Sequence, residues 1–118
     1  MQKIYSNFEP GDILVLELPF TDLLGRKLRP VAVISSGDLN RLSEDLIVSK
    51  ISSSTFFPEY EVVIEQDDLA EGKLKKTSYI HCHSLFTVEK SLVFRKVGRL
   101  SGKKIDEVRR VLKKVFEV

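Results

Sequence analysis

Six short apolar segments, followed by one segment of helical periodicity, restrict the fold that this chain can adopt. Each apolar segment is rich in β-branched residues or alternates apolar with polar residues, and clusters of Gly, Pro, Asp or Ser separate them. They span residues 13–18, 31–34, 46–51, 61–65, 78–83 and 92–97. So many short strands in about eighty residues predict a small barrel.

The C-terminal segment predicts one amphipathic helix that packs on the sheet. Ile105, Val108, Leu112 and Val115 recur every three or four residues. Ser101 is placed to cap the first turn, and Lys and Arg gather toward the last turns. The expected fold is therefore mainly β, a small and strongly bent antiparallel sheet with a C-terminal helix. Periodicity alone does not choose among OB, SH3-like and other small barrels.

The length and cysteine content indicate a single domain in a reducing compartment. The 118 residues are enough for one core, so we expect residues 1–118 to form one domain. No apolar run approaches the roughly 20 residues of a membrane span, and the N-terminus lacks the apolar stretch of a signal peptide, which predicts a cytoplasmic protein. The single cysteine, Cys82, cannot form an internal disulfide and is expected to be a buried thiol.

The charge is distributed unevenly along the chain. Residues 1–70 contain 6 Lys and Arg against 12 Asp and Glu, whereas residues 71–118 contain 13 against 5. The basic half could face a polyanion, although most of its cations are best explained as the solvated face of the terminal helix. Lys73, Lys75 and Lys76 are better placed for phosphate contact.

The segment from Gly11 to Ser35 reads as two strands joined by a polar, glycine-containing loop. Pro30 restricts Arg29, the residue before it, to extended conformations. An arginine held at the entrance of a strand suits phosphate, because its planar, permanently charged guanidinium matches phosphate oxygens in a bidentate manner.

The same segment resembles the first loop of the MazF/PemK family of toxin ribonucleases. In that family a strand beginning Gly-Asp, a Pro-Phe-Thr-Asp turn and a Lys-x-Arg-Pro-hydrophobic run occur in this order, as they do here at residues 11–12, 19–22 and 27–31. Asn40-Arg41 and residues 47–54, 72–78 and 96–101 continue the resemblance as far as the helix. Each block is weak alone, and their order and spacing make the match specific.

This resemblance implies an SH3-like barrel of the MazF/PemK and CcdB type, and a specific function. The chain is expected to be the endoribonuclease toxin of a type II toxin-antitoxin system. Such toxins form homodimers and cleave single-stranded RNA at particular sequences without a metal ion or cofactor. A small antitoxin protein threads into the groove and neutralises them.

Metal-free RNA cleavage requires groups that accept and supply protons, and donors for the charged phosphorane formed when the 2′-hydroxyl attacks. By resemblance, Arg29 corresponds to the family's catalytic arginine, and Ser52 to the hydroxyl that binds the scissile phosphate. Without the resemblance, Arg29 would be read as a loop arginine in a surface ion pair. Ser52 and its neighbours Ser53 and Ser54 would be read as turn residues whose hydroxyls satisfy backbone amides.

His81 and His83 are the third catalytic prediction. On a strand they share one face while Cys82 points to the other, and an imidazole can carry protons near neutral pH. Some family members have Arg-Cys-Asp near these positions, so this chain departs from the pattern. Ordinary strand histidines are the alternative. A metal site is a weaker reading, because a third protein ligand is needed and nothing in the sequence indicates one.

Loop residues with hydroxyl, cationic or aromatic side chains complete the predicted RNA-binding surface. They are Phe20, Thr21, Lys27, Ser53, Lys75, Lys76 and Thr77. Phe56 and Phe57 could also stack on unpaired bases, although paired loop rings are more often packing contacts. Phe8, Phe94 and Phe116 are expected in the core.

Two other functions stay open from the sequence. A barrel-type module could bind RNA or a peptide without cutting it, since a fold does not determine a function. A related barrel could instead inhibit a protein target such as a topoisomerase.

Overall fold

The computed structural model describes residues 7–19 and 26–117. In these ranges one antiparallel sheet has the strand order β4-β6-β3-β2-β1-β7-β5. The strands are β1 (Asp12–Pro19), β2 (Arg26–Val33), β3 (Asp45–Ser52), β4 (Glu61–Ile64), β5 (Leu69–Gly72), β6 (Ser78–Glu89) and β7 (Val93–Leu100). The helices are α1 (Gly37–Leu42) and α2 (Gly102–Phe116), with 3₁₀ turns at Pro58–Tyr60, Gln66–Asp68 and Lys90–Leu92.

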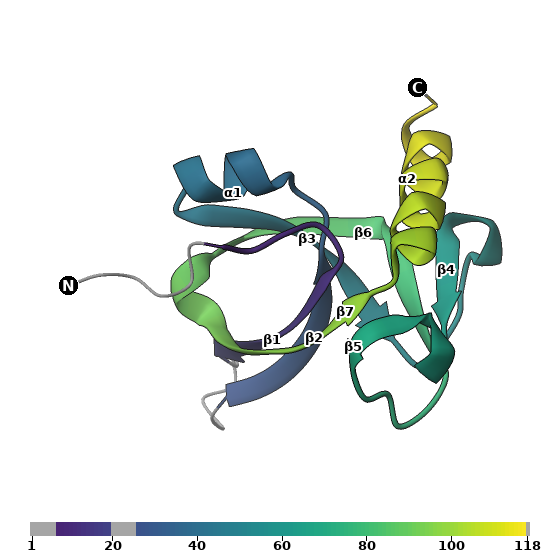
Figure 1. Cartoon of the computed structure of the whole chain (residues 1–118), viewed down its shortest axis with the longest axis horizontal. Coiled ribbons are helices and arrows are strands. Elements are labelled where there is room, and N and C mark those ends of the chain that lie inside the picture. Colours follow the sequence, from purple (N-terminus) through teal and green to yellow (C-terminus); the bar gives the residue numbers. More distant parts are fainter. Residues whose placement is uncertain (1–6, 20–25, 118) are drawn as a thin grey trace.

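The sheet curls on itself into a half-barrel, with α1 near one end and α2 beside β4 at the other (Figure 1). The bend is visible in the pairing of β3 with β6, where Ser49 pairs with Leu85 but the next residue, Lys50, pairs with His81. Three residues of β6 are therefore accommodated between two successive pairs. Such an irregularity bends a strand and increases its twist.

Two apolar clusters fill the fold. One contains residues of β3, β4 and β6 packed against α2, and the other fills the curl formed by β1, β2, β3 and β6. Cys82 is fully buried in the first cluster and Phe8 is buried in the second, as the sequence predicted. Phe94 and Phe116 were predicted to be core residues, and this was wrong, because they are 54% and 58% exposed.

The helix predicted at the C-terminus is confirmed as α2. The Ser101 hydroxyl accepts a hydrogen bond from the Lys104 amide at 3.3 Å, which is the expected N-cap interaction. The sheet contains one more strand than expected, β5, and α1 was also not predicted. Both are short, with 4 and 6 residues, and such lengths give little periodicity. No helix of the described residues is long and apolar enough to cross a membrane.

The Gly11-Asp12 pair at the start of β1 has a structural role. Gly11 has φ +94°, and a Cβ atom there would lie 2.6 Å from Cδ1 of Ile105 in α2, so both backbone conformation and packing favour glycine. Asp12 is buried, and its carboxylate pairs with Arg99 at 2.7 Å and Lys96 at 3.2 Å. This pair of residues therefore joins β1 to α2 and β7.

Candidate functional site

A groove of about 520 Å³ lies across β2, β3 and the start of β6. It gathers four residues that the sequence predicted separately, namely Arg29, Ser52, Ser53 and Lys76. The remaining lining residues are Pro30, Val31, Lys50, Ile51, Ser78 and Phe86. The fold thus places the end of β3 beside the Arg29-Pro30 segment of β2.

The groove is suited to an anion. Its lining combines three cations, Arg29, Lys50 and Lys76, with three serine hydroxyls, and these described lining residues include no Asp, Glu or His. Arg29 and Lys50 are exposed, so both can reach a ligand from solvent. These cations and hydroxyls could hold the negatively charged phosphates of a phosphodiester backbone through charge-assisted hydrogen bonds.

Lys50 is a groove residue that the sequence reasoning missed. It pairs with Val31 across β2 and β3, which sets it next to Arg29-Pro30. Side chains two residues apart on a strand share a face, so Lys50 and Ser52 project to the same side of β3. The two-residue spacing between Lys50 and Ser52 was the sequence signal that could have identified Lys50 as a groove residue.

Ser52 ends β3 and begins the loop over residues 53–57. Its hydroxyl oxygen accepts a hydrogen bond from the Ser54 amide at 3.0 Å, as a turn-forming serine does. The hydroxyl hydrogen is separate from this interaction, so the side chain can still donate to a phosphate oxygen. The turn thereby fixes the Ser52 oxygen at the groove.

The two histidines form a separate cluster that does not line this groove. His81 and His83 stack with 5.0 Å between ring centroids and 24° between planes, so the predicted shared face is confirmed. His81 is buried, and its Nε2 lies 2.8 Å from the Ser54 carbonyl oxygen, which can only accept. His83 is more accessible, with 22% of its side chain exposed.

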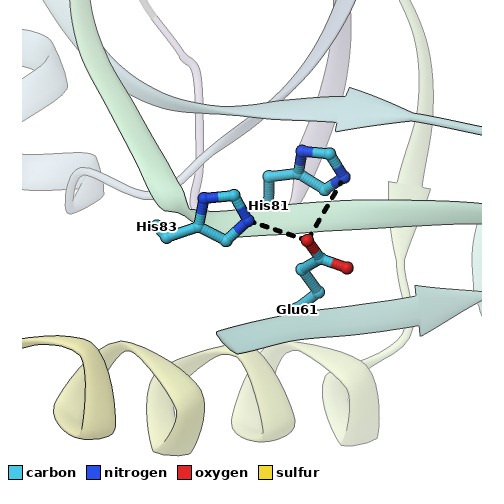
Figure 2. Close-up of side chains that lie close together, drawn as sticks. All are labelled: Glu61, His81 and His83. Carbon is cyan, nitrogen blue, oxygen red and sulfur yellow. Dashed lines mark hydrogen bonds and ion pairs between the residues drawn. The ribbon is translucent and has the colours of Figure 1, made fainter. Parts of the chain in front are cut away.

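The carboxylate of Glu61, from β4, faces both imidazoles, as Figure 2 shows. Its Oε2 is 2.8 Å from His83 Nε2 and 3.7 Å from His81 Nε2. Glu61 was absent from the sequence predictions, because only the pairing of β4 with β6, which sets Glu61 opposite His81, brings it here. No sequence signal could have located it.

The Glu61 carboxylate is buried and ionised. Burial is the strongest influence on its pKa and raises it, but hydrogen bonds from the Thr55 hydroxyl, the Phe57 amide, His83 and the Phe56 amide together outweigh burial. The net effect lowers the pKa of Glu61 to about 2. The cluster thus holds a fixed negative charge.

The other predicted RNA-binding residues are not part of the groove lining. Lys75 and Thr77 are exposed on the turn before β6, and Lys27 is exposed on β2. Phe20 and Thr21 lie outside the described residues. Phe56 and Phe57 also do not line the groove, and their rings instead make edge contacts with His81 and His83.

Comparisons with known proteins point to one family. Residues 9–116 match the family model of the PemK-like, MazF-like toxin of type II toxin-antitoxin systems. A search of curated proteins found no match.

Solved structures share the fold. An endoribonuclease from a mycobacterial species superposes with a TM-score of 0.77 at 13% identity, covering 98% of this chain and 97% of the other. A MazE-MazF structure from Deinococcus radiodurans gives 0.75 at 17% identity, covering 95% and 98%. A mycobacterial endoribonuclease in complex with its cognate antitoxin gives 0.72 at 13% identity, covering 94% and 96%. The mainly β, MazF/PemK-like fold with a C-terminal helix that was predicted from sequence is thereby confirmed, in the form of a curled half-barrel.

Proposed function

Because this chain belongs to the family of PemK-like, MazF-like toxins of type II toxin-antitoxin systems, we propose that it is an endoribonuclease toxin that cleaves single-stranded RNA. The observation that carries this proposal is the groove in which Arg29, Lys50, Ser52 and Lys76 converge. A cationic groove with hydroxyl donors holds an RNA backbone and leaves the bases to contact the surrounding loops.

Cleavage in this groove would need no metal ion. Arg29 would hold two oxygens of the scissile phosphate, and the Ser52 hydroxyl would donate to one of them. Lys50 and Lys76 would contact the phosphate or its neighbours. These donors would stabilise the charge that develops on the phosphorane as the 2′-hydroxyl attacks and the 5′-oxygen leaves. Ser53, Lys75, Thr77, Lys27, Phe20 and Thr21 stay predicted RNA-binding residues, through which cleavage would become sequence-specific.

His81 and His83 stay the predicted proton carriers. The hydrogen bond between His81 and the Ser54 carbonyl connects them to the loop that begins at Ser52. His83 is the stronger of the two predictions, because a proton carrier must reach the substrate and the His83 ring is the more exposed. Neither histidine lines the groove, so either could act only if the bound RNA extends from the groove to the cluster of His81, His83 and Glu61.

The proposed partners are an antitoxin and a second copy of this chain. One structural neighbour is an endoribonuclease in complex with its cognate antitoxin. An acidic antitoxin segment would complement the Arg and Lys residues of the groove and compete with RNA for them. An adjacent gene for a short acidic protein would support this pairing. A homodimer would extend the groove across both copies, and the protein would act in the cytoplasm.

Incubation of the purified protein with a long unstructured RNA in excess chelator tests the proposal. We expect fragments that begin and end at a defined sequence and carry 2′,3′-cyclic phosphate ends. Arg29→Ala should abolish them, whereas Arg110→Ala, which removes an exposed arginine of α2, should not. Fragments from Arg29→Ala at the wild-type rate would contradict the proposed site.

A second function, RNA binding without cleavage, is favoured by one observation, the lack of Asp, Glu and His among the described lining residues. A groove without these groups offers fewer proton carriers for catalysis. In the same experiment such a module would leave the RNA intact and retard it on a gel. An inhibitor of a protein target would neither cut nor retard the RNA.

A further inference from the structure

The cluster of Glu61, His81 and His83 does not line the groove, yet it concentrates strong ligand atoms. The Glu61 carboxylate oxygen and the two imidazole nitrogens lie within 4.8 Å of one another. Figure 2 shows the carboxylate directed at both rings from the neighbouring strand. This arrangement supplies the third protein ligand that the sequence alone did not reveal.

We propose that Glu61, His81 and His83 form a binding site for one divalent transition-metal ion of the zinc type. Two imidazoles and a carboxylate are a ligand set that zinc accepts in proteins. Magnesium and calcium prefer oxygen ligands, so two nitrogen donors disfavour them. His81 and His83 are also the predicted proton carriers of RNA cleavage, but zinc binding needs only the geometry of this cluster and is measured without RNA.

Interactions outside the cluster hold the carboxylate in place. The Thr55 hydroxyl donates to Glu61 Oε1 at 2.6 Å, and the amides of Phe56 and Phe57 donate to Oε2 at 3.2 and 3.0 Å. Hydrogen bonds of this kind orient a ligating carboxylate and keep it ionised.

The nitrogen atoms require only a small rearrangement. In this state His83 Nε2 donates to the carboxylate and His81 Nε2 to the Ser54 carbonyl. For Nε2 to bind zinc, each neutral imidazole would carry its proton on Nδ1 instead of Nε2, and the ion would lie about 2.0 to 2.2 Å from each nitrogen and oxygen. Ligand atoms of a tetrahedral site are then roughly 3.4 Å apart. Glu61 Oε2 is 3.7 Å from His81 Nε2 and 2.8 Å from His83 Nε2, and all three atoms lie within 4.8 Å of one another, so side-chain shifts on the order of an ångström would bring them to this spacing.

The surroundings supply a further ligand and a path of entry. The Ser54 carbonyl oxygen, 2.8 Å from His81 Nε2, is placed to become a fourth ligand. The partly exposed edge of His83 gives an ion access from solvent. Cys82 lies in the core on the opposite face of β6, so the thiol takes no part. Bound metal would connect β4, β6 and the loop that follows Ser52.

The test uses the untagged full-length protein, stripped with chelator and dialysed. Calorimetric titration with zinc chloride should show one ion per chain, and magnesium chloride should show none. Glu61→Gln and His83→Ala should each weaken zinc binding about 100-fold, since each removes one of three protein ligands. Cys82→Ala, a substitution of the intervening buried residue, should bind zinc as the wild type does.

A second measurement on the unsubstituted protein keeps the proposal testable if a variant fails to fold. Cobalt(II) added to the stripped wild type should produce the visible absorption of a tetrahedral nitrogen and oxygen site, and one equivalent of zinc should remove it. Zinc affinity that is unchanged in folded Glu61→Gln and His83→Ala would overturn the proposal, as would the absence of cobalt absorption. RNA cleavage in chelator is read separately, so failure of this site and failure of the proposed nuclease are distinguishable.

Discussion

Glu61 accepts a hydrogen bond from His83 Nε2 at 2.8 Å, across 22 positions of sequence and between two neighbouring strands. The pairing of β4 with β6 creates this contact, since Glu61 is opposite His81 in the register. The consequence is a buried carboxylate and two imidazoles in one cluster. The groove lined by Arg29, Lys50, Ser52 and Lys76 is formed by different side chains, so the two clusters differ in their chemistry.

The first prediction concerns the groove arginine. Arg29→Ala should lower the rate of RNA cleavage by about 100-fold or more, because it removes a charged donor from the transition state. The exposed position of Arg29 predicts little change in folding. Cleavage assays with matched thermal melts check both expectations, and Arg110→Ala is the control for loss of positive charge. A folded Arg29→Ala protein with wild-type activity would remove Arg29 from the site.

The second prediction separates the serines at the end of β3. Ser52→Ala should reduce cleavage strongly, whereas Ser52→Thr should retain most of it, because both hydroxyls can donate to phosphate. Ser53→Ala should have a smaller effect. Initial rates on one RNA substrate measure the three variants side by side. Greater sensitivity at Ser53 than at Ser52 would show that the functional hydroxyl is one residue farther along.

The third prediction assigns a binding role to Lys50. Lys50→Ala should weaken binding of a single-stranded RNA oligonucleotide by a similar factor for all sequences, because a phosphate contact carries no base information. The slope of log affinity against log salt should become shallower by about 0.7, the value expected for one lost contact. Fluorescence anisotropy at several salt concentrations measures this slope, and an unchanged slope would contradict the assignment.

The fourth prediction follows from the pKa of Glu61, which is lowered from 4.5 to about 2 in the folded protein. A carboxylate with a depressed pKa stabilises the fold above its unfolded pKa, and this stabilisation is lost as the pH falls from about 4.5 toward 2. The contribution is on the order of 3 kcal/mol at most. Glu61→Gln should be less stable than the wild type at pH 7, and the difference should shrink toward pH 2.

Urea unfolding at a series of pH values measures this difference. Glu59→Gln, which alters an exposed carboxylate of the Pro58–Tyr60 turn, is the matched control and should behave as the wild type does. A Glu61→Gln protein that loses stability in acid as steeply as the wild type would show that other carboxylates dominate the acid response.

The elements predicted from the sequence are those with strong local patterns. Alternating apolar residues located the core strands, and the Ser101 cap with its apolar periodicity located α2. Phe94 and Phe116 were misassigned because hydrophobicity says little about burial at a β-bulge or at the end of a helix. Arg29 and Ser52, which both line the groove, were selected from short segments that resemble the family's motifs. Glu61 depends on strand pairing, which no local pattern specifies.

The last prediction links the histidines to catalysis. If His83 transfers a proton during cleavage, His83→Ala assayed in chelator should be slower by about 100-fold or more. Imidazole added to the solution should restore part of the lost rate, because it can enter the space left by the His83 ring and carry the proton in its place. Arg29→Ala should show no such rescue, which makes it the control.

Zinc provides an independent test of the same role, given the proposed metal site. A metal-bound imidazole cannot transfer protons, so saturating zinc should suppress cleavage by the wild type, and excess chelator should restore it. Zinc that binds without slowing cleavage, together with wild-type activity of His83→Ala in chelator, would contradict a catalytic role for His83. The cluster would then be a metal site alone. A ring whose Nε2 coordinates zinc keeps its remaining proton on Nδ1 and cannot accept another, so zinc binding and proton transfer by His83 exclude each other.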